Sequence, residues 1–118
     1  MLEDSFLGRP SIEVLWGELV FGGNGSGVFT RTQGTAPHRR FTVSWQGFFA
    51  VSAPTTANAQ VTFREDSQNI VFQYGPTTFQ NLVTIGIQSK QQLSWATRYC
   101  NAVGMYPTNG TKLTLVHM

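Results

Sequence analysis

The sequence predicts an all-β protein, a jelly-roll-like antiparallel β-sandwich of about eight strands with a short N-terminal arm. Three observations support this fold class. Apolar and polar residues alternate in several short runs, turn-forming Gly, Pro, Asn and Ser recur about every ten residues, and strong helix formers are scarce. The length of 118 residues suits one domain, so we expect an arm at 1–10 and a single sandwich domain at 11–118.

The clearest strands lie in the middle of the chain. Residues 39–49 alternate in polarity and place Trp45 on the inner face. Residues 60–75, QVTFREDSQNIVFQYG, predict a hairpin with a polar turn at 66–69 and with Phe72 facing inward. Aromatic rings from these strands are therefore expected to fill the core between two sheets.

The remaining elements are shorter or less regular. Strands are expected over residues 12–21, 28–33, 82–88, 93–99 and 111–118. The glycine-rich segment 22–27 is interpreted as a hairpin turn, because glycine adopts positive φ without steric cost. Residues 50–59 and 103–110 are interpreted as surface loops, which together with the arm could dock on neighbouring subunits.

Composition restricts the classes of partner. Apolar residues make up 41% of the chain and charged residues only 12%, which suits an exterior partly covered by other protein subunits, either copies of itself or a partner on a virion or surface. The formal charge of +2 is too small to indicate nucleic acid, so no nucleic-acid partner is expected. No run of about 18–20 apolar residues occurs, so no membrane insertion is expected.

The sequence contains no recognisable catalytic, cofactor-binding or metal-binding motif, and we expect a protein that is not an enzyme. Cys100 is interpreted as a small buried hydrophobe and His38 as a loop residue. Glu65 and Asp66 are interpreted as solvated turn residues. A small hydrolase that pairs Cys100 with a histidine remains a third hypothesis.

Six side chains are candidates for contact with a partner. Three are in the arm and three are aromatic residues at or near loops: Phe6, Leu7, Arg9, Trp95, Tyr99 and Tyr106. Exposed aromatic rings also stack on sugars, so the alternative function is a carbohydrate-binding module, with glycans as its partners.

An ordered series of motifs covers about residues 12–88. In chain order they are WGEL (16–19), GTAPHR (34–39), FTVSW (41–45), TFRED (62–66), FQYG (72–75) and TIGIQ (84–88). This series resembles a β-sandwich module of bacterial secreted and surface proteins that is related in pattern to the nidogen-like extracellular domain. The arm and residues 89–118 depart from that pattern.

The resemblance implies a module without catalytic residues that acts as a spacer, an adhesive unit or an assembly contact outside the cell. We therefore expect a structural role on a virion or at the cell surface. A capsid decoration protein, a tail component or an adhesin-type contact would each fit this expectation.

Overall fold

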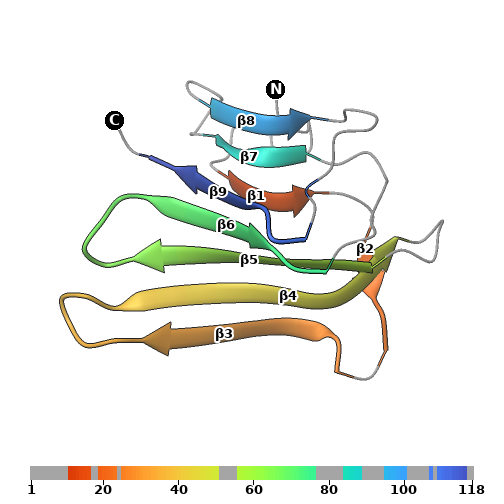
Figure 1. The fold of residues 1–118 in the computed structure, drawn as a ribbon, viewed down its shortest axis with the longest axis horizontal. Coiled ribbons are helices and arrows are strands. Elements are labelled where there is room, and N and C mark those ends of the chain that lie inside the picture. The colour runs from red at the N-terminus through yellow and green to blue at the C-terminus, as the bar shows by residue number, and fades with distance from the viewer. Residues whose placement is uncertain are drawn as a thin grey trace. The chain divides into compact units, whose positions relative to one another are not determined.

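The computed structural model describes residues 11–16, 19–23, 25–50, 56–76, 84–88, 95–100, 107 and 109–116 (Figure 1). At residues 16, 49–50, 84, 88 and 95–100 it describes the backbone alone. All regular elements in these ranges are strands: β1 (Ser11–Trp16), β2 (Leu19–Phe21), β3 (Gly27–Gln33), β4 (Arg40–Ala50), β5 (Thr56–Arg64), β6 (Ile70–Tyr74), β7 (Thr84–Gln88), β8 (Trp95–Cys100) and β9 (Lys112–Leu115). The all-β prediction is confirmed, with strands arranged in two antiparallel sheets.

Contacts divide the chain into two units. One unit comprises residues 1–18 and 80–106 and contains a three-stranded sheet in the order β1-β7-β8. Both strand pairs of this sheet are antiparallel, and each has an irregularity in its register. Val14 and Ile85 are its buried apolar side chains among the described residues. Across the described residues of both units, no helix has the length and hydropathy needed to cross a membrane.

The second unit comprises residues 19–79 and 107–118 and contains a six-stranded sheet. Its order is β2-β4-β5-β6-β9, and β3 pairs with β4 on the edge that β4 also shares with β2. The hairpin of β5 and β6 pairs Val61 with Phe72 and Ala59 with Tyr74, which confirms the strands and the polar turn expected there.

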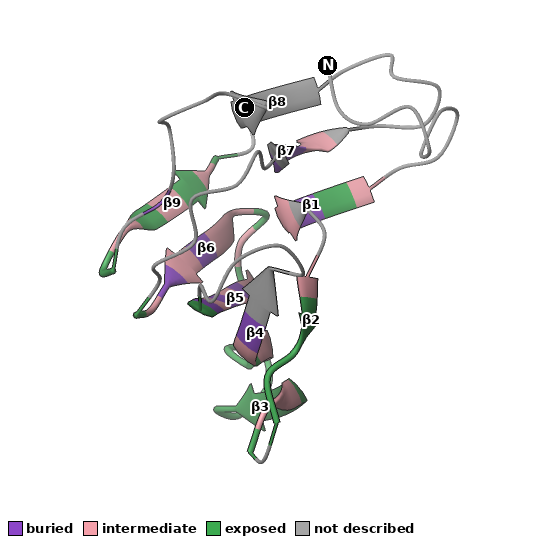
Figure 2. Ribbon diagram, turned by 90° about the vertical axis from the view of Figure 1, so that its right-hand side faces the viewer, coloured by how far each residue is buried: buried purple, intermediate pink, exposed green. Residues whose placement is uncertain are grey.

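This sheet has two chemically distinct faces, because directly paired residues of neighbouring strands project to the same side. The apolar face carries Phe41, Val43, Trp45, Phe48, Ala57, Ala59, Val61, Phe63, Ile70, Phe72, Tyr74, Leu113 and Leu115. The polar face carries Arg31, Arg40, Thr42, Ser44, Asn58, Gln60, Thr62, Arg64, Val71, Gln73, Lys112 and Thr114. Burial is concentrated on β5 and β6, whereas β3 is exposed along almost its whole length (Figure 2).

The prediction of one strand over residues 12–21 is wrong. The chain leaves β1, which pairs with β7, and enters β2, which pairs with β4 in the other sheet. The run is largely apolar on both sides of Gly17 and Glu18, and such runs are compatible with either partner, so the pattern does not reveal a change of sheet.

Two of the expected loops also differ from the structure. Segment 22–27 is not a hairpin turn, because β2 and β3 both run antiparallel to β4 and so point in the same direction along its edge. Segment 50–59 is a loop only in part, since β5 begins at Thr56 and both Ala57 and Ala59 are buried. These two alanines lie opposite Phe48 and Trp45, whose large side chains leave room only for small neighbours on this face.

Candidate interaction surface

The edge formed by β2 and β3 exposes large apolar side chains. Val20, Phe21, Val28 and Phe29 are 37–57% exposed, and Phe41 on the adjoining β4 is 42% exposed. The register places Phe21, Val28 and Phe41 on the apolar face and Phe29 on the opposite face. This edge is therefore apolar on both of its faces.

Strand β3 also leaves one of its two edges open. Among the described residues it pairs only with β4, and all six residues from Val28 to Gln33 are exposed. Natural sheet edges are usually protected by proline, lysine, bulges or shortness. β3 has seven residues, no proline and one charge, Arg31, so its backbone N–H and C=O groups can pair with a further strand.

Ion pairs join two turns at one end of the sheet. One turn connects β3 to β4, and the other follows β5 and contains Glu65 and Asp66. The Arg39 guanidinium donates to both oxygens of Glu65, with N–O distances of 2.8 and 2.6 Å. The backbones of the same residues also meet, because Glu65 N–H donates to the Arg39 carbonyl at 2.9 Å. On the neighbouring carboxylate, Arg64 donates to Asp66 at 3.0 and 3.1 Å, and His38 Nδ1 lies 3.0 Å from it.

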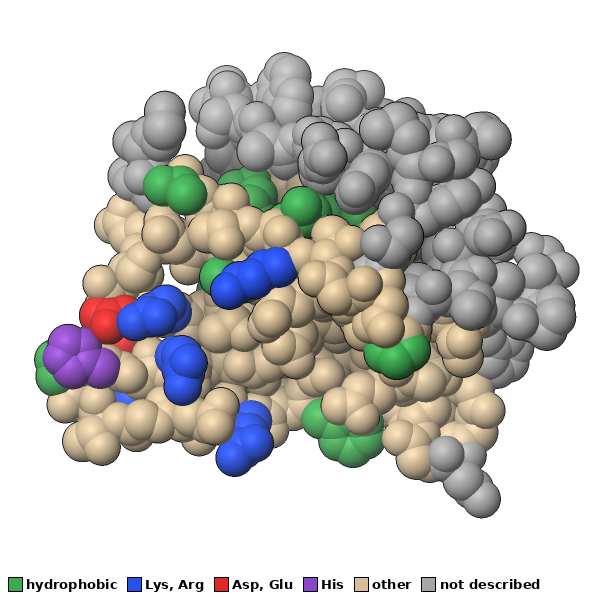
Figure 3. Space-filling view, viewed as in Figure 1, with side chains coloured by type: hydrophobic (Ala, Val, Ile, Leu, Met, Phe, Trp, Pro, Cys, Tyr) green, Lys and Arg blue, Asp and Glu red, His purple; other side chains and the backbone are tan. Residues whose placement is uncertain are grey.

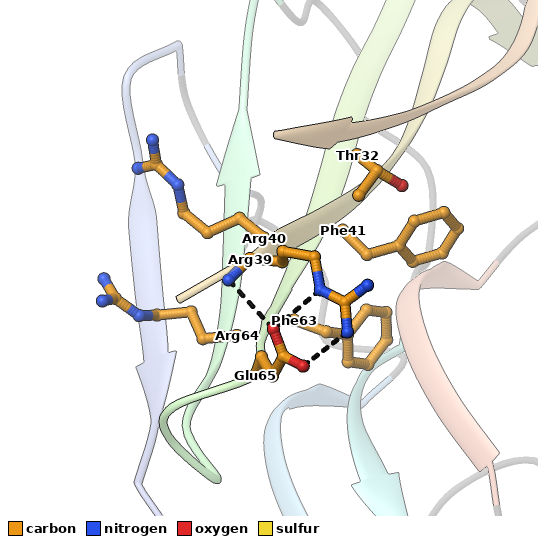
Figure 4. A pocket seen from close by; sticks show the side chains of 7 residues that line it. All are labelled: Thr32, Arg39, Arg40, Phe41, Phe63, Arg64 and Glu65. Carbon is orange, nitrogen blue, oxygen red and sulfur yellow. Dashed lines mark hydrogen bonds and ion pairs between the residues drawn. The ribbon is translucent and has the colours of Figure 1, made fainter. Parts of the chain in front are cut away.

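A shallow pocket of about 310 Å³ lies beside these turns. Phe41 and Phe63 stack with their ring centroids 6.5 Å apart, and the Arg39–Glu65 pair lies next to the rings (Figure 4). Thr32 from β3 completes this side of the lining. An apolar floor with a charged rim suits an anchoring side chain of a protein partner.

The same ion pairs set the protonation of the two turn acids. Hydrogen bonds from the Arg39 guanidinium, followed by the Arg39 backbone N–H, lower the pKa of Glu65 to about 2. Hydrogen bonds from Arg64 and then His38 hold the pKa of Asp66 well below its usual value. Both acids are exposed turn residues, as expected from the sequence, and each is also held in an ion pair that the sequence did not predict.

The first testable prediction concerns Glu65. Its pKa is lower in the folded than in the unfolded chain, so its stabilising contribution is complete above about pH 4.5 and is lost as the pH falls to about 2. An NMR titration of the Glu65 carboxyl carbon should give a midpoint near 2, which Arg39→Gln should raise toward 4.5. Arg40→Gln is the matched control and should leave the midpoint in place, because Glu65 bonds to Arg39. A wild-type midpoint above 4 would contradict this account.

A family model described as NIDO related matches residues 2–115. The chain belongs to the NIDO-related family. The resemblance seen in the motifs is thereby confirmed. No curated protein and no solved structure matches the chain significantly.

The NIDO-related match extends beyond the motif series at both ends. The interpretation that the arm and residues 89–118 depart from the family pattern is therefore wrong. The C-terminal part contributes a strand to each sheet, because β8 pairs with β7 and β9 pairs with β6. These strands are integral to the two sheets, although their sequences lack the conspicuous motifs of residues 12–88.

The six predicted contact residues are not tested by the described part of this NIDO-related chain. Phe6, Leu7, Arg9 and Tyr106 lie outside the described residues, and Trp95 and Tyr99 are in β8, where only the backbone is described. The side chain of Cys100 is likewise outside the described set. Among the described residues, no three His, Cys, Asp or Glu side chains are grouped as a metal site would require.

Sequence reasoning missed the exposed edge and the joined turns. The alternation assigns a side chain to a face, but it does not report whether anything covers that face. The sequence contains one signal for the joined turns, the opposite charges of residues 39 and 65. If residues 40 and 64 pair across antiparallel strands, residues 39 and 65 are the next pair and lie side by side.

Proposed function

We propose that this NIDO-related chain is a non-enzymatic structural and interaction module that assembles with other protein subunits on the outside of a virion or cell. The observation that carries the proposal is the open β3 edge, which combines unpaired strand length with exposed apolar side chains. A partner strand added to β3 would extend the six-stranded sheet.

The pocket supports the same proposal. It lies beside the end of β3, and Thr32 belongs to both the edge and the pocket lining. A partner strand along β3 could therefore place one apolar side chain against Phe41 and Phe63. Main-chain hydrogen bonds would supply affinity, and this anchor would supply specificity.

The test compares two substitutions of exposed valines. Val28→Lys places a charge on the open edge, whereas Val116→Lys makes the same chemical change just after β9. We expect Val28→Lys to reduce the amount of chain on intact particles or cells at least about tenfold, as judged with an antibody to the chain. Val116→Lys should leave it unchanged, and circular dichroism should confirm that both variants fold.

Two results would contradict the proposal. Equal surface labelling for Val28→Lys and the wild type would show that the β3 edge is not the assembly contact. Absence of the wild-type chain from the outside of particles and cells would remove the proposed location.

A further inference from the structure

The polar face of the six-stranded sheet carries four cations, of which the three arginines lie close together and the lysine lies farther along the face. Arg31 of β3, Arg40 of β4, Arg64 of β5 and Lys112 of β9 share this face and are all exposed. Basic side chains lie near one another on the face seen in Figure 3 (blue). Arg40 and Arg64 are directly paired, so their Cα atoms are about 5 Å apart, and strand spacing places Arg31 roughly 8 Å from Arg40.

Most of this positive charge is not neutralised within the unit. Residues 19–79 and 107–118 contain five basic residues, but their only acids are Glu65 and Asp66. These two acids already bind Arg39 and Arg64. No ion pair reaches Arg31, Arg40 or Lys112 from the described part of the chain.

The direct pairing of Arg40 with Arg64 is unfavourable in the isolated sheet. Like charges opposite each other on one face of neighbouring strands repel, and one carboxylate offsets only part of this repulsion. A bound anion would relieve it, because the Arg40 guanidinium can donate two parallel hydrogen bonds to a carboxylate or a sulfate. Arg64 binds Asp66 through Nε and Nη2 and has further N–H groups on Nη1 for the same anion.

Hydroxyl and amide groups fill the space between the cations. The Thr42 and Thr62 hydroxyls lie 3.1 Å apart, and the Gln60 amide donates to Gln73 Oε1 at 2.8 Å. These groups can exchange hydrogen bonds with the hydroxyls of a sugar chain. Base stacking along a single-stranded nucleic acid would instead need a row of exposed rings, and Phe29 is the one exposed aromatic side chain that the described register places on this face.

We propose that the polar face binds an acidic polysaccharide, with its carboxylates or sulfates on Arg31, Arg40, Arg64 and Lys112 and its hydroxyls on the threonine and glutamine side chains between them. The site includes Arg31 of β3, and Arg40 and Arg64 also line the pocket. It uses side chains of the polar face, whereas the proposed assembly contact uses the backbone edge of β3 and the rings of the apolar face. Its test measures glycan binding and not surface assembly, so each proposal can fail without the other. The site also differs from the aromatic sugar-binding site that the sequence offers as the alternative function.

The experiment measures binding of the whole chain to immobilised heparin and polygalacturonate at about 50 mM salt, where charge screening is moderate. Arg31→Gln, Arg40→Gln and Lys112→Gln should each weaken binding by about three- to tenfold. The matched control is Lys90→Gln, which removes the same charge from the other unit of the chain and should change binding less than about twofold. Comparing the affinity for heparin, which is sulfated, with the affinity for polygalacturonate, whose anions are carboxylates, shows which anion the face prefers.

A second variant separates a built site from simple charge attraction. Thr42→Val keeps the shape and charge of residue 42 but removes its hydroxyl, and should weaken glycan binding by about threefold. An equal loss for Lys90→Gln and Arg40→Gln would overturn the proposal, as would undiminished binding by Thr42→Val. Tighter binding to oligo(dT) or to anionic vesicles than to either glycan would also overturn it.

Discussion

Replacing Phe72 with alanine should lower the free energy of unfolding by about 3–5 kcal/mol. Phe72 is fully buried on the apolar face, between Val61 on one neighbouring strand and Leu113 on the other. Removing the ring loses its transfer free energy and leaves a cavity that both neighbouring strands would have to close. Urea unfolding followed by tryptophan fluorescence would measure the change.

The matched control for this prediction is Phe41→Ala. Phe41 lies on the same face and stacks on Phe63, but its side chain is 42% exposed. It should therefore cost only about 1–2 kcal/mol. Similar losses for the two variants, or a loss below about 1 kcal/mol for Phe72→Ala, would mean that the buried centre of the face is not at Phe72.

The alternation in the sequence predicts which face of the sheet each side chain of a central strand lies on. It does not predict how deeply that side chain is buried, as Phe72 and Phe41 show. Both alternate inward, and both share the apolar face. β4 and β6 are each one strand from an edge of the sheet, but Phe72 lies between Val61 and Leu113. In contrast, the β3 residue beside Phe41 is Thr32, and β3 is itself exposed. Burial therefore depends on what the paired strands contribute, which local alternation does not encode. The same reason applies to Trp45, which was expected in the core and is only half-buried.

At residues 56–59 the sequence pattern fails to indicate a strand for a different reason. Ala57 and Ala59 alternate with polar residues as a strand requires, but alanine contributes little hydrophobic contrast. The burial of Ala59 is explained by the strand pairing, which places Trp45 on one side of it and Tyr74 on the other. Small residues opposite large rings are a property of the pair, and the pairing is not visible in one strand alone.

The candidate surfaces also depend on register. Arg31, Arg40, Arg64 and Lys112 are spread over some eighty positions of sequence and gave no basic cluster beyond the adjacent arginines at 39 and 40. Antiparallel pairing of the strands brings them onto one face and sends Arg39 to the turn with Glu65. The small net charge of +2 therefore conceals a strongly uneven distribution between the two units.

Replacing Gly47 with alanine should lower the free energy of unfolding by about 2–4 kcal/mol. Gly47 lies in the bulge of β4, where two residues oppose Asn58 of β5, and its φ is +71°. Its N–H donates to Asn58 Oδ1 at 3.0 Å, and its carbonyl accepts from the Gly22 N–H at 2.8 Å. An added Cβ would also lie 2.8 Å from the Ser26 Cβ, so the backbone conformation and the packing both resist the change.

Gly25→Ala separates these two effects. Gly25 has a similar φ of +81°, but an added Cβ there would meet nothing within 4 Å. It should cost about 1 kcal/mol, the usual penalty for placing a side chain in this backbone region. In a double-mutant cycle, Ser26→Gly should recover part of the free energy of unfolding that Gly47→Ala loses. The reference for the double variant is Ser26→Gly alone, because this change also removes the hydrogen bonds between Ser26 Oγ and Gly23. The explanation would be contradicted if Gly47→Ala and Gly25→Ala lowered the free energy of unfolding equally and Gly47→Ala showed no coupling to Ser26. Close packing of Gly47 against the glycine-rich segment would then not be what holds β2 and β3 in line along β4.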